Sequence, residues 1–243
     1  MPKNFEIDDC GTLRSWEPYG IEVIFPVSEI EIGGVTKTRG GGHICLPYGN
    51  EHIHLPEYAG LDIPQHGLAR IGGHSSLTRV DRAINNQKLL LRFDRPSWHD
   101  VEVSANSFEN DTESVLDHAV HVIPDEPLVT NFGFHPYFAT HGNKFTVEVD
   151  NRELTDSDKR DDLSKGILIP LENAEDRRLC VSIENVGDIF ITLPRFTAEY
   201  TGFVVWSDSP EHYICAEPVM KEFHHMEAGY SKVFRCVLRF QPK

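Results

Sequence analysis

The sequence has no close pair of cysteines, no excess of positive charge and no long hydrophobic run. Its five cysteines are widely spread without a Cys-x-x-Cys pair, which argues against a disulfide framework or a zinc ribbon. The formal net charge is −15, from 23 Lys plus Arg against 38 Asp plus Glu. Nucleic acids and anionic membranes are bound by basic surfaces, so we expect neither as a partner. The polar N-terminal residues, which resemble neither a signal peptide nor a membrane span, predict a cytoplasmic protein.

Amphipathic helices are also missing, and the dominant periodicity is two residues. Apolar and polar residues alternate over 145–150, 179–184, 189–193 and 234–240, as in strands that bury one face. Six further strands are predicted at Ile21–Phe25, Lys88–Phe93, Val101–Phe108, His118–Ile123, Gly166–Leu171 and Gly202–Ser207. We expect at most one short helical turn, within 111–118, and a solvated loop over the polar run 151–165. The sequence therefore predicts a single all-β domain over 1–243, a large antiparallel sandwich or barrel with very little helix.

Four short segments carry polar and ring-bearing side chains that turns alone do not require. They are Arg39–Asn50, Pro64–Arg70, Asn131–Phe138 and Ile214–Pro218. His135 lies among aromatic residues, where desolvation can move an imidazole pKa into a range useful for proton transfer, although a core histidine bonded to backbone is the alternative. Glu217 follows an apolar strand and precedes a proline, so we expect it at a strand end, where a rigid backbone suits a general base. Phe134, Phe138 and Trp206 suit either a sugar-binding surface or the core.

Together these segments resemble the aldose 1-epimerase, or galactose mutarotase-like, family. Four stretches are similar to motifs of that family and follow its order: His66-Gly-Leu-Ala-Arg70, Gly133-Phe-His-Pro-Tyr-Phe138, Val204-Val-Trp-Ser207 and Cys215-Ala-Glu-Pro218. Arg39-Gly-Gly is similar to a segment of the hexose-6-phosphate branch. The resemblance implies a large antiparallel β-sandwich of the galactose-mutarotase type with an open cleft and without a metal or an organic cofactor. It implies a small sugar as the partner, and we expect a monomer or a homodimer.

In that family an aldose exchanges its α and β anomers through ring opening and reclosure. The resemblance implies that His135 is the general acid at the ring oxygen and that Glu217 is the base at the C1 hydroxyl. Acid and base catalysis of this kind contributes roughly 10²–10⁴-fold for each group. The resemblance also implies that His66 and Arg70 bind the sugar, and that Arg39 binds a phosphate or a hydroxyl.

Two features of the substrate site stay open in the sequence. The family's substrate-binding aspartate has two candidates, Asp176 and Asp188. A free aldose and a hexose 6-phosphate are both compatible with the motifs, and the charge of −15 favours the neutral sugar because it repels an anion at long range. That preference loses its basis if Arg39 and Arg70 face the same pocket.

Two other functions fit parts of the sequence. One is a non-catalytic carbohydrate-binding protein on the same fold, against which the presence of an acid and a base argues. The other is a metal-dependent cupin, because His52-Ile-His54 with Glu57 and His66 is similar to a histidine–carboxylate metal site. The spacing from His54 to Glu57 is shorter than in the usual cupin motif, and 13 histidines offer many chance pairs.

Overall fold

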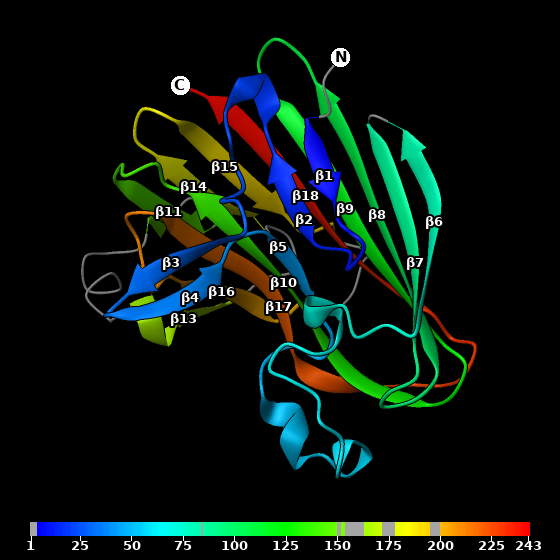
Figure 1. The fold of residues 1–243 in the computed structure, drawn as a ribbon. Coiled ribbons are helices and arrows are strands. Elements are labelled where there is room, and N and C mark those ends of the chain that lie inside the picture. The colour runs from blue at the N-terminus through cyan, green and yellow to red at the C-terminus, as the bar shows by residue number, and fades with distance from the viewer. Residues whose placement is uncertain (1–3, 84, 150–151, 154–162, 172–177, 195–199) are drawn as a thin grey trace.

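The computed structural model describes residues 4–83, 85–149, 152–153, 163–171, 178–194 and 200–243 (Figure 1). Two antiparallel sheets, one of seven strands and one of nine, pack face to face around a shared apolar core. The helical turns among the described residues are 3-10 turns of three or four residues. The predicted antiparallel β-sandwich with very little helix is therefore confirmed.

The seven-stranded sheet carries the residues of three of the four polar segments. Its strands, in spatial order, are β1 (Phe5–Ile7), β2 (Leu13–Trp16), β5 (Gly42–Cys45), β10 (Leu128–Ala139), β17 (Tyr213–Met226), β16 (Gly202–Trp206) and β13 (Ile167–Pro170). All of β10 and the first eight residues of β17 are buried on both faces. A strand covered on both faces has no need to alternate apolar and polar residues, which explains why β10 gives no two-residue period.

The nine-stranded sheet contains all four alternating segments. Its order is β12 (Arg152–Glu153), β11 (Phe145–Val149), β14 (Arg178–Ile183), β15 (Gly187–Thr192), β18 (Lys232–Pro242), β9 (Ser114–Pro124), β8 (His99–Glu109), β7 (Asn86–Phe93) and β6 (Ser76–Ala83). Buried and half-buried residues alternate along β9 and β7, because one face of each packs on the core and the other faces outward.

Smaller elements surround the sheets. The hairpin of β3 (Ser28–Ile32) and β4 (Val35–Arg39) projects at the left of Figure 1. The described ranges also contain five 3-10 turns: η1 (Pro18–Gly20), η2 (Glu51–His54), η3 (Pro56–Tyr58), η4 (Ala69–Ile71) and η5 (Leu163–Lys165). The segment with η2 and η3 projects below the sheets in the same view.

Two local predictions are wrong. Ile21–Phe25 forms no strand, and only Ile24 makes an isolated bridge, to Phe138. No helical turn forms at 111–118. The Asn110 side chain instead accepts hydrogen bonds from the backbone N–H groups of Thr112 and Glu113, and β9 begins at Ser114. Of the polar run predicted as a loop, 151–165, only 152–153 and 163–165 lie within the described residues, and they form β12 and η5.

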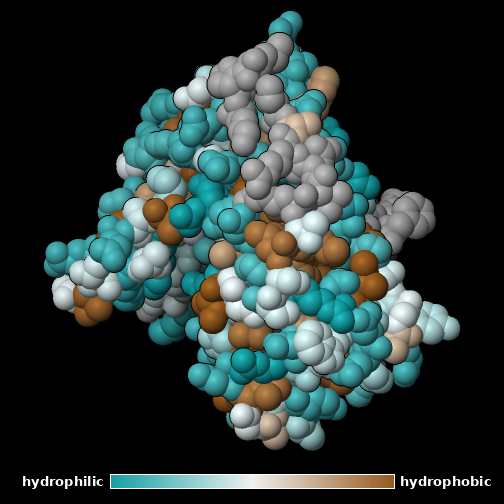
Figure 2. Space-filling model, turned by 45° about the vertical axis from the view of Figure 1, so that its right-hand side comes forward, coloured by the Kyte–Doolittle hydropathy of each residue, from teal (hydrophilic) through white to brown (hydrophobic). Residues whose placement is uncertain are grey.

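The surface is predominantly hydrophilic on the side shown in Figure 2, where hydrophobic residues form separate groups. All five cysteines are free thiols, and Cys45, Cys215 and Cys236 are buried. In the part of the chain that the structure describes, no helix has the length and apolarity needed to cross a membrane.

Candidate active site

A cavity of about 330 Å³ opens on the face of the seven-stranded sheet that points away from the core. Arg39, His66, Arg70, His135 and Glu217 all line it. The structure thus brings all five predicted site residues together from separate strands and loops. A volume of this order is typical of small-molecule sites.

His135 and Glu217 lie on β10 and β17, the two strands at the centre of the sheet. Tyr137 pairs with Cys215 two residues away on each strand, so the register sets His135 opposite Glu217. His135 Nε2 lies 3.4 Å from Glu217 Oε1. Within the described residues, His135 Nδ1 has no hydrogen-bond partner.

Glu217 does not end its strand, contrary to the prediction. β17 continues through Pro218 to Met226. The pairing between β10 and β17 has a gap around Pro136 and Pro218, because proline has no N–H to donate to a ladder. On its other side β17 stays paired, with Pro218 opposite Phe203 of β16. The glutamate is therefore held in the middle of a sheet, a more rigid place than a strand end.

Burial controls the protonation of this pair. His135 is 5% exposed and Glu217 is 2% exposed. Burial lowers the pKa of His135 well below 6.5, and His66 and Arg70 act in the same direction. Burial raises the pKa of Glu217 to about 8, against a hydrogen bond from Tyr48 and the charge of Arg70, which both favour the carboxylate. At neutral pH the pair therefore favours its uncharged form, in which His135 is a neutral imidazole and Glu217 is a protonated carboxylic acid.

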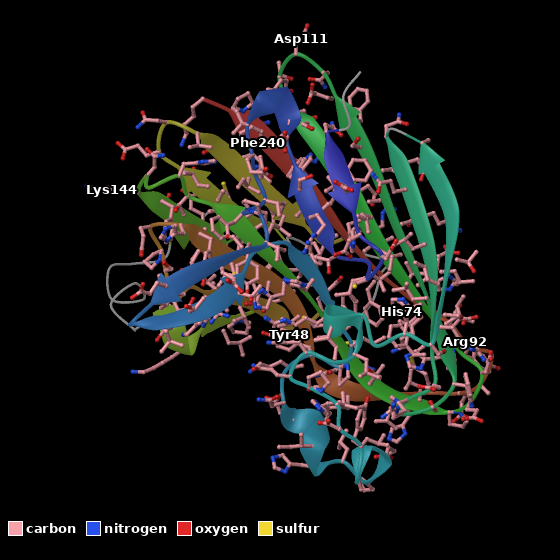
Figure 3. All side chains as sticks on the ribbon, viewed as in Figure 1. Tyr48, His74, Arg92, Asp111, Lys144 and Phe240 are labelled. Atoms are coloured by element: carbon pink, nitrogen blue, oxygen red, sulfur yellow. The ribbon has the colours of Figure 1, made fainter. Side chains whose placement is uncertain are left out.

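Tyr48 is a site residue that the sequence analysis did not single out. Its hydroxyl donates a hydrogen bond to Glu217 Oε2 at 3.0 Å. Asn131 fixes the Tyr48 backbone: Oδ1 accepts its N–H at 2.7 Å and Nδ2 donates to its carbonyl oxygen at 3.2 Å. A Cβ at Gly133 would lie 2.2 Å from the Tyr48 ring, so only glycine leaves room for it. Figure 3 shows Tyr48 beside the strands of the seven-stranded sheet, above the η2–η3 segment.

His66 is held in one tautomer by its loop. Its backbone is left-handed, with φ 66°, and Gly67 follows with φ 79°. A Cβ at Gly67 would lie 1.9 Å from the carbonyl oxygen of Leu46, which explains the His-Gly sequence. The Gly49 amide donates to His66 Nδ1 at 3.3 Å, so Nε2 carries the proton and is available to donate to a ligand. Burial, followed by the charge of Arg70, lowers the pKa of His66 to about 3, so the ring stays neutral.

Arg39 is tied to Asp208, another residue that the sequence analysis missed. Arg39 donates from Nε to Oδ1 at 3.2 Å and from Nη2 to Oδ2 at 2.7 Å. Lys37 and the Tyr213 hydroxyl also donate to this carboxylate. Burial alone would raise the pKa of Asp208, but these hydrogen bonds hold it well below its usual range. The guanidinium carbon lies 5.4 Å from the centre of the Trp206 ring, so Arg39 both closes one wall and holds the indole.

Arg39 and Arg70 do line the same cavity, so the charge-based preference for a neutral sugar loses its basis. Within the described part of the chain, Arg70 forms no ion pair. Of the two candidate aspartates, Asp176 lies outside the described residues. Asp188 belongs to β15 in the other sheet, accepts the Ser182 hydroxyl and does not line the cavity.

The aromatic residues divide between core and cavity. Phe134 and Phe138 point into the core between the sheets. Trp206 lines the cavity, as does Tyr137, whose ring stacks on His135 at 4.8 Å between centroids. Flat rings beside polar donors suit the binding of a sugar.

The residues of the cupin hypothesis do not build a metal site. His52 is buried with Nε2 3.0 Å from the carbonyl oxygen of Ile63. Among the described residues, one group has donor atoms close enough together for a metal ion: His135, Cys215 and Glu217, within 4.8 Å of one another. That group is the pair of His135 and Glu217 with a buried thiol beside it, and it contains none of the residues of the His-x-His motif.

Comparison with known proteins gives matches in structure and none in sequence. No protein-family model matches the chain, and no curated protein matches it in sequence. The galactose mutarotase related enzyme from Lactobacillus acidophilus has a TM-score of 0.69 at 14% identity, over 100% of this chain and 98% of that chain. A galactose mutarotase-like protein from Lactobacillus casei has a TM-score of 0.67 at 14% identity, with the same coverage.

A more distant match is the aldose epimerase homologue from C. elegans, with a TM-score of 0.57 at 11% identity, over 97% of this chain and 93% of that chain. At these identities the likeness establishes the architecture, and its full-length coverage includes both sheets. The chain therefore has the galactose mutarotase-like β-sandwich fold.

Proposed function

We propose that the protein is an aldose 1-epimerase that interconverts the α and β anomers of a hexose. The observation that carries this proposal is the buried pair His135 and Glu217, 3.4 Å apart on the floor of the cavity. Opening a pyranose ring requires one group that gives a proton and one that takes a proton, and this pair provides both.

The reaction moves one proton through the sugar. His135 gives a proton to the ring oxygen while Glu217 takes the proton of the C1 hydroxyl, so the bond between C1 and the ring oxygen breaks and C1 becomes an aldehyde. After rotation about the C1–C2 bond, the ring oxygen attacks the opposite face of C1 and both protons return. The pair alternates between a charged form before opening and a neutral form after it.

The surroundings of the pair control the cost of the charged form. Burial opposes it on both side chains. Tyr48 and Arg70 offset part of that cost at Glu217, the first by a hydrogen bond and the second by its charge. We infer that Tyr48 is a positioning residue that keeps the Glu217 carboxylate accessible.

The walls of the cavity suit a hexose. The Nε2–H of His66 and the guanidinium of Arg70 offer donors for sugar hydroxyls or for charge that develops on the ring oxygen. Trp206 and Tyr137 offer flat apolar faces to a pyranose ring.

A second candidate is a hexose-6-phosphate 1-epimerase. It is favoured by the position of Arg70, which lines the cavity and forms no ion pair within the described residues. Arg39 contributes less, because Asp208 already holds its guanidinium on two sides. Arg70→Gln separates the two candidates, since it should weaken kcat/KM for a phosphorylated hexose far more than for the free sugar.

Polarimetry tests the proposal. Freshly dissolved α-glucose, α-galactose and α-glucose 6-phosphate should each be compared with and without protein. We expect faster approach to the anomeric equilibrium, and loss of the acceleration in His135→Asn and in Glu217→Gln. Wild-type protein that binds a sugar but accelerates none of them would favour a non-catalytic carbohydrate-binding function instead.

A further inference from the structure

A free thiol lies beside the acid–base pair and has no part in the proposed reaction. Cys215 and Glu217 are two residues apart on β17, so their side chains point to the same face of the sheet. Cys215 packs with Tyr137 and Trp206 in a small cluster outside the main core, and both of these rings also line the cavity. The thiol therefore lies on the cavity side of the sheet.

Three side chains bring a nitrogen, a sulfur and an oxygen close to one point. One donor atom from each of His135, Cys215 and Glu217 lies within 4.8 Å of the other two. In a tetrahedral zinc site, bonds of about 2.0–2.3 Å put neighbouring donor atoms about 3.3–3.6 Å apart. His135 Nε2 and Glu217 Oε1, 3.4 Å apart, already have this spacing. The thiol sulfur has to approach them by no more than about 1 Å to complete it.

Glu217 and His135 differ in how well their surroundings hold them for a metal ion. The Tyr48 hydroxyl donates to Glu217 Oε2 at 3.0 Å, which leaves Oε1 as the oxygen next to His135, and such an outer hydrogen bond orients a ligating carboxylate. A ligating histidine usually donates its second N–H to a partner, whereas His135 Nδ1 has none within the described residues. Arg70 in the same cavity also repels a cation. We therefore expect reversible binding rather than a resident ion.

Charge balance decides whether a cation can enter so buried a place, since the three side chains are each 5% exposed or less. With protons on Glu217 and Cys215 and a neutral His135, the group has no net charge. Zn²⁺ bound to a carboxylate, a thiolate and a neutral imidazole has no net charge either, and the two protons pass to the solvent. The exchange therefore avoids the cost of burying an unpaired charge. Mg²⁺ and Ca²⁺ prefer oxygen ligands alone, so the thiol and the imidazole select zinc.

We propose that His135, Cys215 and Glu217 form a binding site for Zn²⁺, with a water from the cavity as the fourth ligand, and that zinc inhibits the protein. Zinc takes the lone pairs of His135 and Glu217 that exchange protons with the sugar, so metal and substrate exclude each other. Zinc is here a competitor of the sugar and not a cofactor of the reaction. The inhibition rests on the function proposed above, whereas the metal site does not.

Co²⁺ is the probe for this site, because it occupies zinc sites and gives a strong near-ultraviolet absorption band when a thiolate binds it. The reduced wild-type protein should show this band on binding Co²⁺, and Zn²⁺ should displace it. Cys215→Ser should lose the band and weaken Co²⁺ binding by about tenfold or more. Cys45→Ser is the matched control, because that thiol is also buried in the seven-stranded sheet but does not belong to the group. It should keep the band.

Polarimetry tests the inhibition. Zinc should slow the anomerisation of a hexose by the wild-type protein. Cys215→Ser should need about tenfold more zinc for the same inhibition. Its activity without zinc should stay within about threefold of the wild type, because the thiol makes no contact that the reaction uses. If Cys215→Ser does not fold, Glu217→Gln gives the second binding test, since an amide is a weaker ligand than a carboxylate and should weaken Co²⁺ binding by about tenfold.

Three results would overturn the proposal. One is wild-type protein that binds no Co²⁺ or binds it without the thiolate band. Another is a band that persists in folded Cys215→Ser, and the third is equal inhibition by zinc in this variant and in the wild type. The spectrum needs no sugar, so a band that depends on Cys215 supports the metal site even where no sugar is converted. Loss of the proposed function and loss of the metal site are therefore told apart.

Discussion

Replacing Tyr48 by Phe removes one hydroxyl and leaves the ring that packs over Gly133. The lost group is the donor to Glu217 Oε2 at 3.0 Å, and it favours the carboxylate over the neutral acid. A hydrogen bond to a charged group contributes about 1.5–3 kcal/mol. Because a pKa unit corresponds to about 1.4 kcal/mol, Tyr48→Phe should raise the pKa of Glu217, now about 8, by roughly 1–2 units.

This shift has a direct kinetic consequence. His135 must carry a proton while Glu217 is ionised to accept the proton of the C1 hydroxyl. The pair loses that one proton above the pKa of about 8, so kcat/KM should fall as pH rises through this value. In Tyr48→Phe the falling part of the profile should move upward by roughly 1–2 pH units. At pH 7 kcat/KM should fall by roughly 10–100-fold, because fewer pairs hold the proton on His135 with Glu217 ionised. Polarimetric rates between pH 6 and pH 10, corrected for the uncatalysed reaction, give the profile.

Tyr58→Phe is the matched control. The Tyr58 hydroxyl is also buried, but it donates to the carbonyl oxygen of Val129 at 2.8 Å and does not line the cavity. Its removal should cost about 1 kcal/mol of stability and leave the pH profile in place. A Tyr48→Phe profile that coincides with the wild-type profile would refute the positioning role.

Three further predictions concern buried groups. Gly133→Ala puts a Cβ 2.2 Å from the Tyr48 ring, so it should lower both the melting temperature and kcat/KM, and a crystal structure with Tyr48 unmoved would contradict this. Burial lowers the pKa of His66 to about 3 and of His118 to about 4, so the stability that these neutral rings contribute is complete above pH 6.5 and falls as pH drops toward those values. The loss should be about 2 kcal/mol per histidine at pH 5. In urea unfolding, the drop in the free energy of unfolding between pH 7 and pH 5 should therefore be about 2 kcal/mol smaller in His118→Gln than in the wild type. Glu217 has the opposite pH dependence: the stability from its raised pKa is complete below pH 4.5 and is lost as pH rises toward 8. Glu217→Gln should therefore have a higher melting temperature than the wild type at pH 8. A difference in melting temperature between variant and wild type that is the same at pH 4.5 and pH 8 would contradict this.

The sequence predicted the nine-stranded sheet better than the seven-stranded one, and the difference is physical. Strand β9 covers the core with one face only, so its residues alternate in a visible period. β10 is buried on both faces and shows no period, although it carries His135. The segment 21–25 is apolar enough for a strand, yet its amides bond to carbonyls of Trp16 and Tyr137 in two different strands, which leaves it between them.

The residues of the candidate site also fall into two groups, those that the sequence located and those that it did not. Motifs that resemble a known family located His135 and Glu217, which the register of two central strands then sets opposite each other. Tyr48 and Asp208 were missed because their roles come from partners far away in the chain. Tyr48 is 169 residues from Glu217, and Asp208 is 169 residues from Arg39. Only the folded sheet brings these partners into contact.

The proposed reaction requires His135 and Glu217 to exchange protons with the ring oxygen and the C1 hydroxyl of a hexose. Magnetisation-exchange NMR on the H1 signals of equilibrated α- and β-glucose or galactose measures this interconversion directly. We predict exchange peaks with the wild-type protein and none above the uncatalysed rate with His135→Asn or Glu217→Gln, each shown to be folded by circular dichroism. Exchange that persists in either folded variant would contradict the account.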